Sequence, residues 1–386
     1  MEKIQYDMIY LAACGVNKAL PEKSFLEALD MEKVYRLSVA HYLEALVGTT
    51  LKQAGISVSK SWVEHISKAV RKNILFDAER EKLFAFMEQN GIWYMPLKGI
   101  VLKDYYPAVG MRQMSDNDIL FDERFWNEVQ KYMESQGYKC TSVGKNNHDV
   151  YEKEPVYNFE LHRSLYGATH QNEMEEYYKD IKDKLVSDSD TSYGYHFTDE
   201  DFYVYIVSHA YKHYSGSGTG LRSLLDFYVY LKAKEQEMDF AYIEKECEVL
   251  GIAEFERKNR SLCKKVFNVS ELKGMESLKQ QLSAEEQKML LYYLSSGVYG
   301  TVEREVENGI NRLKEENVKN SKMRYVLQRL FPGNDTYKHY SGKCRYKFVQ
   351  SIFGWVHRVF VVLFTKSRRE RILREIKAVK KIKTND

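Results

Sequence analysis

The chain has 386 residues, which is enough for two or three domains or for one large composite domain. Hydrophobic residues make up 44% and charged residues 29%, as in ordinary globular proteins. The 58 basic and 55 acidic residues leave a formal charge of +3. A nucleic-acid-binding domain is usually strongly basic, so this balance argues against nucleic acid as a partner.

The cysteine pattern indicates a reducing compartment. The number of cysteines is odd, they are widely separated and no CxxC pair occurs, so neither a thiolate zinc site nor a disulfide framework is expected. The N-terminus lacks the basic region and apolar core of a signal peptide. We therefore expect a cytoplasmic protein. The cysteines are Cys14, Cys140, Cys247, Cys263 and Cys344.

Residues 1–90 are predicted to be a helical N-terminal region. Between Met31 and Gly55, apolar residues recur at spacings of three and four, the pattern of an amphipathic helix. A second helix is predicted over Trp62–Glu88, because the sequence Gln-Asn-Gly that follows is a helix stop signal.

Residues 91–195 are predicted to form a compact α/β unit. The segments 92–99, 115–121 and 156–162 are short and rich in residues that favour strands. An amphipathic helix is predicted over Phe125–Gln136. Alternation of strands with a helix over such a short stretch is typical of an α/β core.

Residues 196–386 are predicted to be a helical C-terminal region. Thr198 and the acidic residues after it form a helix start, and the glycine-rich loop at 215–220 separates this helix from the next. Phe348–Thr365 is apolar over about the minimum length that spans a membrane, but His357 and Arg358 lie at its centre. A buried or amphipathic helix is the favoured interpretation. Membrane-surface contact, aided by the basic residues that follow, is the alternative.

Asp116 and Asp118 are the first candidates for chemistry. They lie two residues apart at the start of a predicted strand, and alternate residues of a strand point to one face. Their carboxylates are expected to project together, roughly 6–7 Å apart along the backbone. Mg²⁺ prefers oxygen ligands, and two such ions can activate an attacking oxygen and neutralise a leaving pyrophosphate. We expect this pair to bind one or two Mg²⁺ ions.

Glu160 is a charged residue between the apolar residues Phe159 and Leu161, within the strand predicted at 156–162. Buried carboxylates are rare without a partner. On a strand beside the aspartates, Glu160 would complete the metal site or act as a general base toward an acceptor hydroxyl. The alternative is a structural ion pair with a nearby lysine or arginine.

Lys98 and Gly99 follow the first predicted strand. Glycine lets backbone N–H groups approach phosphate closely, and here it opens a predicted helix over Ile100–Asp104 whose N-terminus favours anions. Lys98 and Arg112 are therefore candidate phosphate contacts.

These motifs together resemble the uncharacterised nucleotidyltransferase family of bacterial proteins, within the polymerase-beta-like superfamily. The family pattern consists of LKG, a tyrosine-proline, R-x-M-x-D-x-D and an E-x-H strand. Asn117 stands where the family has an apolar residue. The matching segments are Leu97–Gly99, Tyr106–Pro107, Arg112–Asp118, Glu160–His162 and Leu330–Pro332, with His209, His213, Arg222 and Asp226.

The resemblance implies a minimal nucleotidyltransferase fold, in which helices pack on a small mixed sheet. With helical regions on both sides of this core, the whole chain would be an α+β protein. The resemblance also implies a site for NTP and Mg²⁺, with Asp116, Asp118 and Glu160 as metal ligands and catalytic residues. Lys98, Gly99, Arg112 and Ser115 would bind the nucleotide.

The resemblance implies that a further group of residues lies near the substrate, in a helical lid that covers the nucleotide or acceptor. The alternative for the histidines is a structural role in the core. The alternative for Arg222 is an ion pair with Asp226, four residues later on the same helix. The group consists of His209, His213, Arg222 and Asp226. His162 is predicted to share the strand face of Glu160 and to orient the substrate, with a core histidine as the alternative.

The sequence therefore predicts a Mg²⁺-dependent enzyme that moves an NMP from an NTP to a small-molecule or protein acceptor. The alternative is a catalytically silent nucleotide-binding regulatory or adaptor protein. NTP binding without release of pyrophosphate would favour that alternative.

Overall fold

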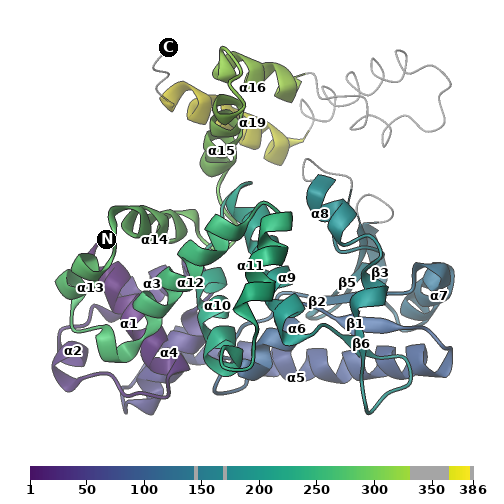
Figure 1. Ribbon diagram of the computed structural model, residues 1–386. Coiled ribbons are helices and arrows are strands. Elements are labelled where there is room, and N and C mark those ends of the chain that lie inside the picture. The colour runs from purple at the N-terminus through teal and green to yellow at the C-terminus, as the bar shows by residue number, and fades with distance from the viewer. Residues whose placement is uncertain (143–146, 168–171, 331–364, 383–386) are drawn as a thin grey trace. The chain divides into compact units, whose positions relative to one another are not determined.

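The computed structural model describes residues 1–142, 147–167, 172–330 and 365–382 (Figure 1). Contacts divide the chain into two compact units. One unit consists of Met1–Tyr211 and Leu221–Val298, and the other of Lys212–Gly220 and Tyr299–Asp386. The division of the chain near residues 90 and 195 remains a prediction from the sequence.

The first unit contains all of the described strands and most of the described helices. Its strands are β1 (Tyr94–Pro96), β2 (Asn117–Phe121), β3 (Lys139–Ser142), β4 (His148–Lys153), β5 (Tyr157–His162), β6 (Val186–Ser187) and β7 (Tyr195–His196). Its helices are α1 (Lys3–Val16), α2 (Lys23–Glu27), α3 (Met31–His41), α4 (Glu44–Gln53), α5 (Lys60–Gln89), α6 (Gly99–Leu102), α7 (Trp126–Ser135), α8 (Asn172–Tyr177), α9 (Asp199–Tyr214), α10 (Leu221–Lys234), α11 (Phe240–Val249), α12 (Ala253–Phe267), α13 (Met275–Gln281) and α14 (Ala284–Ser296). The last residues of α9 belong to the second unit.

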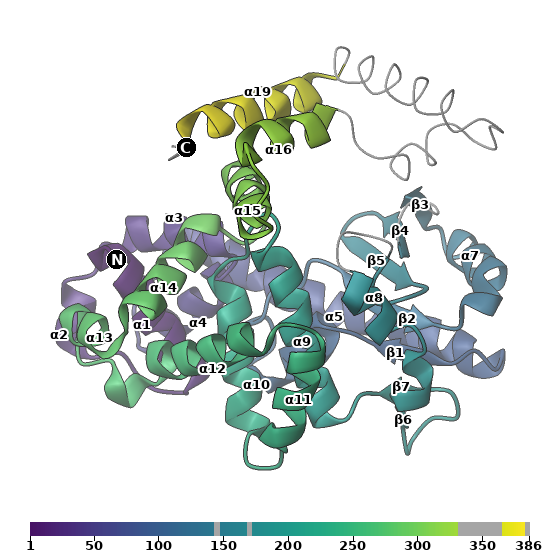
Figure 2. The same cartoon turned by 45° about the horizontal axis from the view of Figure 1, so that its top comes forward.

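The main sheet has five strands in the order β1-β2-β5-β4-β3 (Figure 2). The central strands β2 and β5 are parallel, whereas the other neighbouring strands are antiparallel. Strands β6 and β7 form a separate small antiparallel pair. The predicted α+β fold with a small mixed sheet is therefore confirmed.

One face of this sheet is covered by α5 and α7. Apolar residues from both helices meet the side chains that β2, β4 and β5 point to the same side, as the alternation of strand residues requires. This core contains Phe76, Leu83 and Met87 of α5, Val129 and Met133 of α7, and Ile119, Phe121, Tyr151, Phe159 and Leu161 of the strands. The opposite face of β2 and β5 carries the candidate site.

The helices outside the sheet come from both ends of the first unit. Helix α1 contacts α3, α4 and α12, and α10 contacts α12 and α14 (Figure 2). Most of α1 is buried, from Tyr6 to Val16. Residues from the start and from the end of the first unit therefore pack together in this helical core.

Several predicted elements are confirmed with small changes at their ends. The helix predicted over Trp62–Glu88 is α5, and the helix predicted over Phe125–Gln136 is α7. The helical stretch between Met31 and Gly55 is divided into α3 and α4, because Tyr42 adopts a left-handed conformation with φ of 58°. The predicted helix start at Thr198 is also confirmed, since its Oγ1 accepts a hydrogen bond from the Asp201 N–H at 3.1 Å.

The second unit is helical and contains α15 (Val302–Glu315), α16 (Ser321–Leu330) and α19 (Lys366–Lys381). Its core consists of Val306, Ile310, Leu313, Tyr325 and Ala378. Within the described ranges, no helix has the length and apolar character needed to cross a membrane. The apolar segment Phe348–Thr365 was predicted to be a buried or amphipathic helix, with membrane-surface contact as the alternative. It lies outside the described residues except for Thr365.

Candidate active site

Two neighbouring strands bring the predicted carboxylates together. In the parallel pair β2 and β5, Asp118 lies directly opposite Glu160. Asp116 comes just before β2, two residues ahead of Asp118. Since alternate residues of a strand share a face, the three side chains lie on the sheet face that α5 and α7 leave uncovered.

Asp118 is the most firmly bound of the three carboxylates. Its side chain is only 5% exposed, and its Oδ1 accepts hydrogen bonds from Lys98 Nζ at 2.7 Å and from His162 Nε2 at 3.0 Å. Burial alone would raise the pKa of Asp118. The Lys98 charge and the His162 hydrogen bond outweigh it and hold that pKa well below its usual range. Asp118 is therefore ionised at neutral pH.

Glu160 and Asp116 are in a less favourable electrostatic position. Burial and the charges of Asp118 and Asp116 raise the pKa of Glu160 to about 8. Burial and the charge of Asp118 raise the pKa of Asp116 as well, although nearby cations partly offset this. Three oxygen-ligand residues that repel one another fit a hard divalent cation, because its charge would relieve the repulsion.

Lys98 lies where β1 turns into α6. Its backbone adopts φ of 44°, which is unusual for a residue other than glycine, and its ammonium group points to Asp118. The charges of Asp118, Glu160 and Asp116 outweigh burial and raise the pKa of Lys98. The next residue must be small, because a Cβ on Gly99 would lie 2.5 Å from Arg112 Nη1. The turn therefore places a lysine and a helix start beside the carboxylates.

Lys72 is a cation beside the site that the sequence analysis missed. It lies on α5, and its Nζ donates a hydrogen bond to the Ser115 carbonyl at 2.9 Å. Burial lowers the pKa of Lys72, and the charge of Asp116 partly offsets that effect. A signal was present in the sequence, because Lys72 lies between Ala69 and Phe76 on the apolar side of this helix.

Arg112 is held in a buried ion pair with Asp226 of α10. Its Nε and Nη2 donate hydrogen bonds to the two carboxylate oxygens of Asp226, both at 2.9 Å, and the Tyr106 hydroxyl donates a third at 2.7 Å. The ion pair that the sequence left open for Asp226, with Arg222, is thus replaced by one with Arg112. The physical reason is that α10 packs against the loop before β2, which no helical spacing predicts.

Arg222 lies near the carboxylates instead. Its guanidinium stacks over the Tyr42 ring, 5.1 Å from the ring centroid, and Nη1 donates to the Gln113 carbonyl at 3.4 Å. Its charge lowers the pKa of Asp116, which shows that the two groups are close enough to interact. Asp116 is therefore surrounded by cations from α5, α10 and the start of α6.

The two predicted histidines of α9 lie in different surroundings. His209 is half-buried, and its ring centroid is 6.3 Å from that of Tyr205. Burial and the charges of Asp118 and Glu160 raise the pKa of Tyr205, so this part of α9 faces the carboxylates. His213 is exposed and belongs to the second unit, so its predicted role remains a prediction.

His148 and Asn147 were also missed, because β4 was not predicted as a strand. Strand β4 pairs with β5, and His148 Nε2 lies 3.6 Å from Glu160 Oε2. Asn147 Nδ2 lies 3.3 Å from His162 Nδ1. The sequence offered no clear strand signal here, because charged or polar residues fall on both alternating faces of 148–153.

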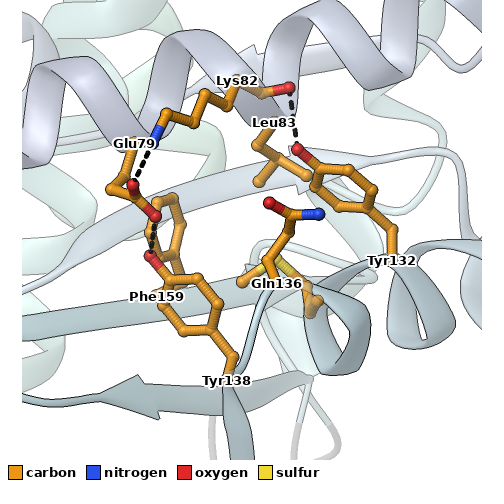
Figure 3. A pocket seen from close by; sticks show the side chains of 8 residues that line it. Glu79, Lys82, Leu83, Tyr132, Gln136, Tyr138 and Phe159 are labelled. Atoms are coloured by element: carbon orange, nitrogen blue, oxygen red, sulfur yellow. Dashed lines mark hydrogen bonds and ion pairs between the residues drawn. The ribbon is translucent and has the colours of Figure 1, made fainter.

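A pocket lies on the other face of the sheet (Figure 3). Figure 3 shows Tyr138 directed toward Glu79, to which its hydroxyl donates a hydrogen bond of 2.9 Å. Phe159 lines this pocket and alternates with Glu160 along β5, so the pocket and the carboxylates lie on opposite sides. The pocket is therefore part of the packing of α5 and α7 rather than of the candidate site.

A family model described as uncharacterised nucleotidyltransferase matches residues 27–268, which is more than half of the chain. The matched range contains every candidate residue from Lys98 to Asp226. No curated protein and no solved structure matches the chain. The chain therefore belongs to the uncharacterised nucleotidyltransferase family.

Proposed function

We propose that the chain is a Mg²⁺-dependent nucleotidyltransferase that moves an NMP from an NTP to a small-molecule or protein acceptor. The observation that carries this proposal is the direct pairing of Asp118 with Glu160 across two parallel strands, with Asp116 beside them. Membership in the family supports transfer of a nucleotidyl group. A cytoplasmic location fits the proposal, since NTP is available there.

Asp116, Asp118 and Glu160 would hold the metal. When bound, Mg²⁺ would supply positive charge to the triphosphate and activate the attacking oxygen. Asp118 is already ionised, because the Lys98 charge and the His162 hydrogen bond lower its pKa. Burial and the neighbouring aspartates raise the pKa of Glu160 to about 8, and a bound cation would favour the ionised form that serves as a ligand. Glu160 would thus act as a ligand or accept the proton of the acceptor hydroxyl.

The phosphates of the nucleotide would bind among the cations around Asp116. Lys98 and the backbone N–H at Gly99 approach from the start of α6, and Ser115 lies next to Asp116 in the chain. Lys72 and Arg222 add positive charge from α5 and α10. Arg112 forms an ion pair with Asp226 and is not available to the phosphates. Its proposed role is to fix the backbone beside Gly99 and Asp116.

Calorimetric titration with ATP, GTP, CTP and UTP, each with and without Mg²⁺, tests the proposal. We expect one nucleotide to bind in a metal-dependent way. Asp116→Asn should weaken that binding, because the cation that joins the protein to the phosphates would lose one of its protein ligands. Binding must be followed by pyrophosphate release when an acceptor is supplied. NTP binding without release under any acceptor screen would favour the nucleotide-binding adaptor instead. Failure of every nucleotide to bind would contradict the proposal.

Lys72→Met should weaken nucleotide binding by about tenfold, as expected for loss of one charge-assisted hydrogen bond of roughly 1.5 kcal/mol to a phosphate. Methionine keeps an unbranched apolar side chain at this position. It removes the ammonium group, with its hydrogen bond to the Ser115 carbonyl and its contact over the Phe76 ring. The matched control is Lys68→Met, one turn earlier on α5, where the lysine is exposed. Equal dissociation constants for the two variants would remove Lys72 from the proposed phosphate site.

A further inference from the structure

Two histidines flank Glu160 on neighbouring strands. His162 follows Glu160 by two residues on β5 and so shares its face of the sheet. In the antiparallel pair of β4 and β5, His148 lies directly opposite His162. Figure 2 shows β4 running beside β5 in the same sheet. Both imidazoles therefore come from regular strands, whose backbone fixes their positions.

The ligand atoms of these three residues converge. Glu160 Oε2 lies 3.6 Å from His148 Nε2 and 3.8 Å from His162 Nε2, and the three atoms all lie within 4.8 Å of one another. Ligand atoms bound to one tetrahedral ion by bonds of about 2.0–2.1 Å lie roughly 3.3 Å apart. Small side-chain rotations would close the remaining distance.

Asn147 orients the His148 ring. Its amide nitrogen donates to the carbonyls of Ser164 at 2.7 Å and Leu165 at 3.1 Å, which fixes its amide oxygen on the other side. That oxygen lies 3.4 Å from His148 Nδ1 and accepts its proton. The Nε2 lone pair of His148 is then directed to the Glu160 side. An outer-shell hydrogen bond of this kind is what metal-binding histidines usually have.

His162 has a matching arrangement. Its ring has a hydrogen bond with the backbone of Ser164, besides the contact between Nε2 and Asp118. Burial lowers the pKa of His162, so the ring is neutral and its one proton lies on Nε2, toward Asp118. Moving that proton to Nδ1, on the side of the Ser164 backbone, leaves the Nε2 lone pair for a cation. A histidine binds a metal ion as the neutral ring.

We propose that His148, Glu160 and His162 bind one divalent transition metal ion of the class of Mn²⁺, Co²⁺ or Zn²⁺. Imidazole nitrogen favours these ions over Mg²⁺, which prefers oxygen and keeps its water ligands. The inference adds to the proposed function, because Glu160 belongs both to the carboxylate ligands of Mg²⁺ and to this histidine site. It rests on the proposed function only for the role of the ion in turnover.

Titration of the metal-free full chain with Co²⁺, and separately with Mg²⁺, tests this site without any nucleotide. We expect wild type to bind one Co²⁺ at least about tenfold more tightly than Mg²⁺. His148→Gln should weaken Co²⁺ binding by at least about tenfold and leave Mg²⁺ binding within about twofold. The matched control is His196→Gln, which removes an exposed histidine that also lies beside a carboxylate, Asp188.

Two results would overturn the site: equal Co²⁺ affinity in wild type and His148→Gln, or tighter binding of Mg²⁺ than of Co²⁺ by wild type. The visible absorption of bound Co²⁺ gives a second measurement on wild type alone, and a spectrum of six oxygen ligands would also contradict the proposal. Because nucleotide is absent, failure here is distinct from failure of nucleotidyl transfer. Co²⁺ binding would stand even if no NTP bound.

Discussion

Replacing Asp116 with asparagine should reduce nucleotidyl transfer by roughly 10²–10³-fold, the range seen when one preorganised electrostatic contact to a reacting group is lost. Asparagine keeps the size of the side chain and removes the negative charge that would bind the cation. The rate is measured as pyrophosphate release with the donor NTP identified by titration. The matched control is Asp104→Asn, which removes an aspartate that is 71% exposed and lies outside the cluster.

The same substitution should leave the metal-free protein at least as stable as wild type. Burial and the charge of Asp118 raise the pKa of Asp116, so its ionised form is disfavoured in the folded chain. Removing that charge relieves repulsion at pH 7. Urea denaturation of both proteins without metal measures the effect. A variant that loses both activity and stability would contradict this account, because the lost activity would then follow from unfolding.

Asp118 differs from Asp116 in this respect. Its charge is compensated by Lys98 and His162, so Asp118→Asn would leave a buried lysine with a weaker partner. Loss of activity in that variant would have two causes that cannot be separated: the missing metal ligand and the weaker partner of Lys98. The contrast between neighbouring aspartates is visible only in the structure, since the sequence presents them as an equivalent pair.

The sequence predicted the centre of the candidate site because that centre depends on short-range order. Asp116 and Asp118 share a face by strand alternation, and Glu160 has an apolar frame that predicts a strand. Pairing of β2 with β5 then brings Asp118 and Glu160 together. The fold class followed from the same alternation of strands and helices, together with the resemblance to the family.

The periphery of the site was not predictable in the same way. Lys72 approaches from a helix more than forty positions before Asp116, and Asp226 reaches Arg112 from more than a hundred positions later. Such contacts depend on how helices pack on the sheet, and no local pattern encodes that packing. His148 was missed for a different reason, because its strand carries charged or polar residues on both of its faces: His148, Asp149, Glu152 and Lys153.

Asn117 shows how a departure from the family pattern is accommodated. It points away from the aspartates, into the interface between β2 and α5, where its Oδ1 accepts a hydrogen bond of 2.9 Å from Arg80 Nη1. Arg80 is also paired with Asp77 on the same helix. A polar residue on this strand is thus matched by a polar partner on the helix that covers it, and β2 keeps its regular pairing.

Asp226→Ala should lower the free energy of unfolding by about 3–5 kcal/mol, the usual cost of removing one partner of a buried ion pair. The Arg112 side chain is 8% exposed, and both of its bonds to Asp226 would be lost, together with the acceptor of the Tyr106 hydroxyl. The uncompensated guanidinium, rather than the lost attraction, accounts for most of the cost. Urea denaturation measures the change.

The double variant Arg112→Met with Asp226→Leu is the matched control. It removes both charges and fills similar volume, so it should recover most of the lost stability. Equal destabilisation of the single and double variants would mean that packing of α10, and not the buried charge, is what Asp226 provides. Because Arg112 also lies against Gly99 and lowers the pKa of Asp116, the recovered double variant should still transfer nucleotide more slowly than wild type. Recovered stability with reduced transfer would separate the positioning role of this ion pair from its contribution to folding.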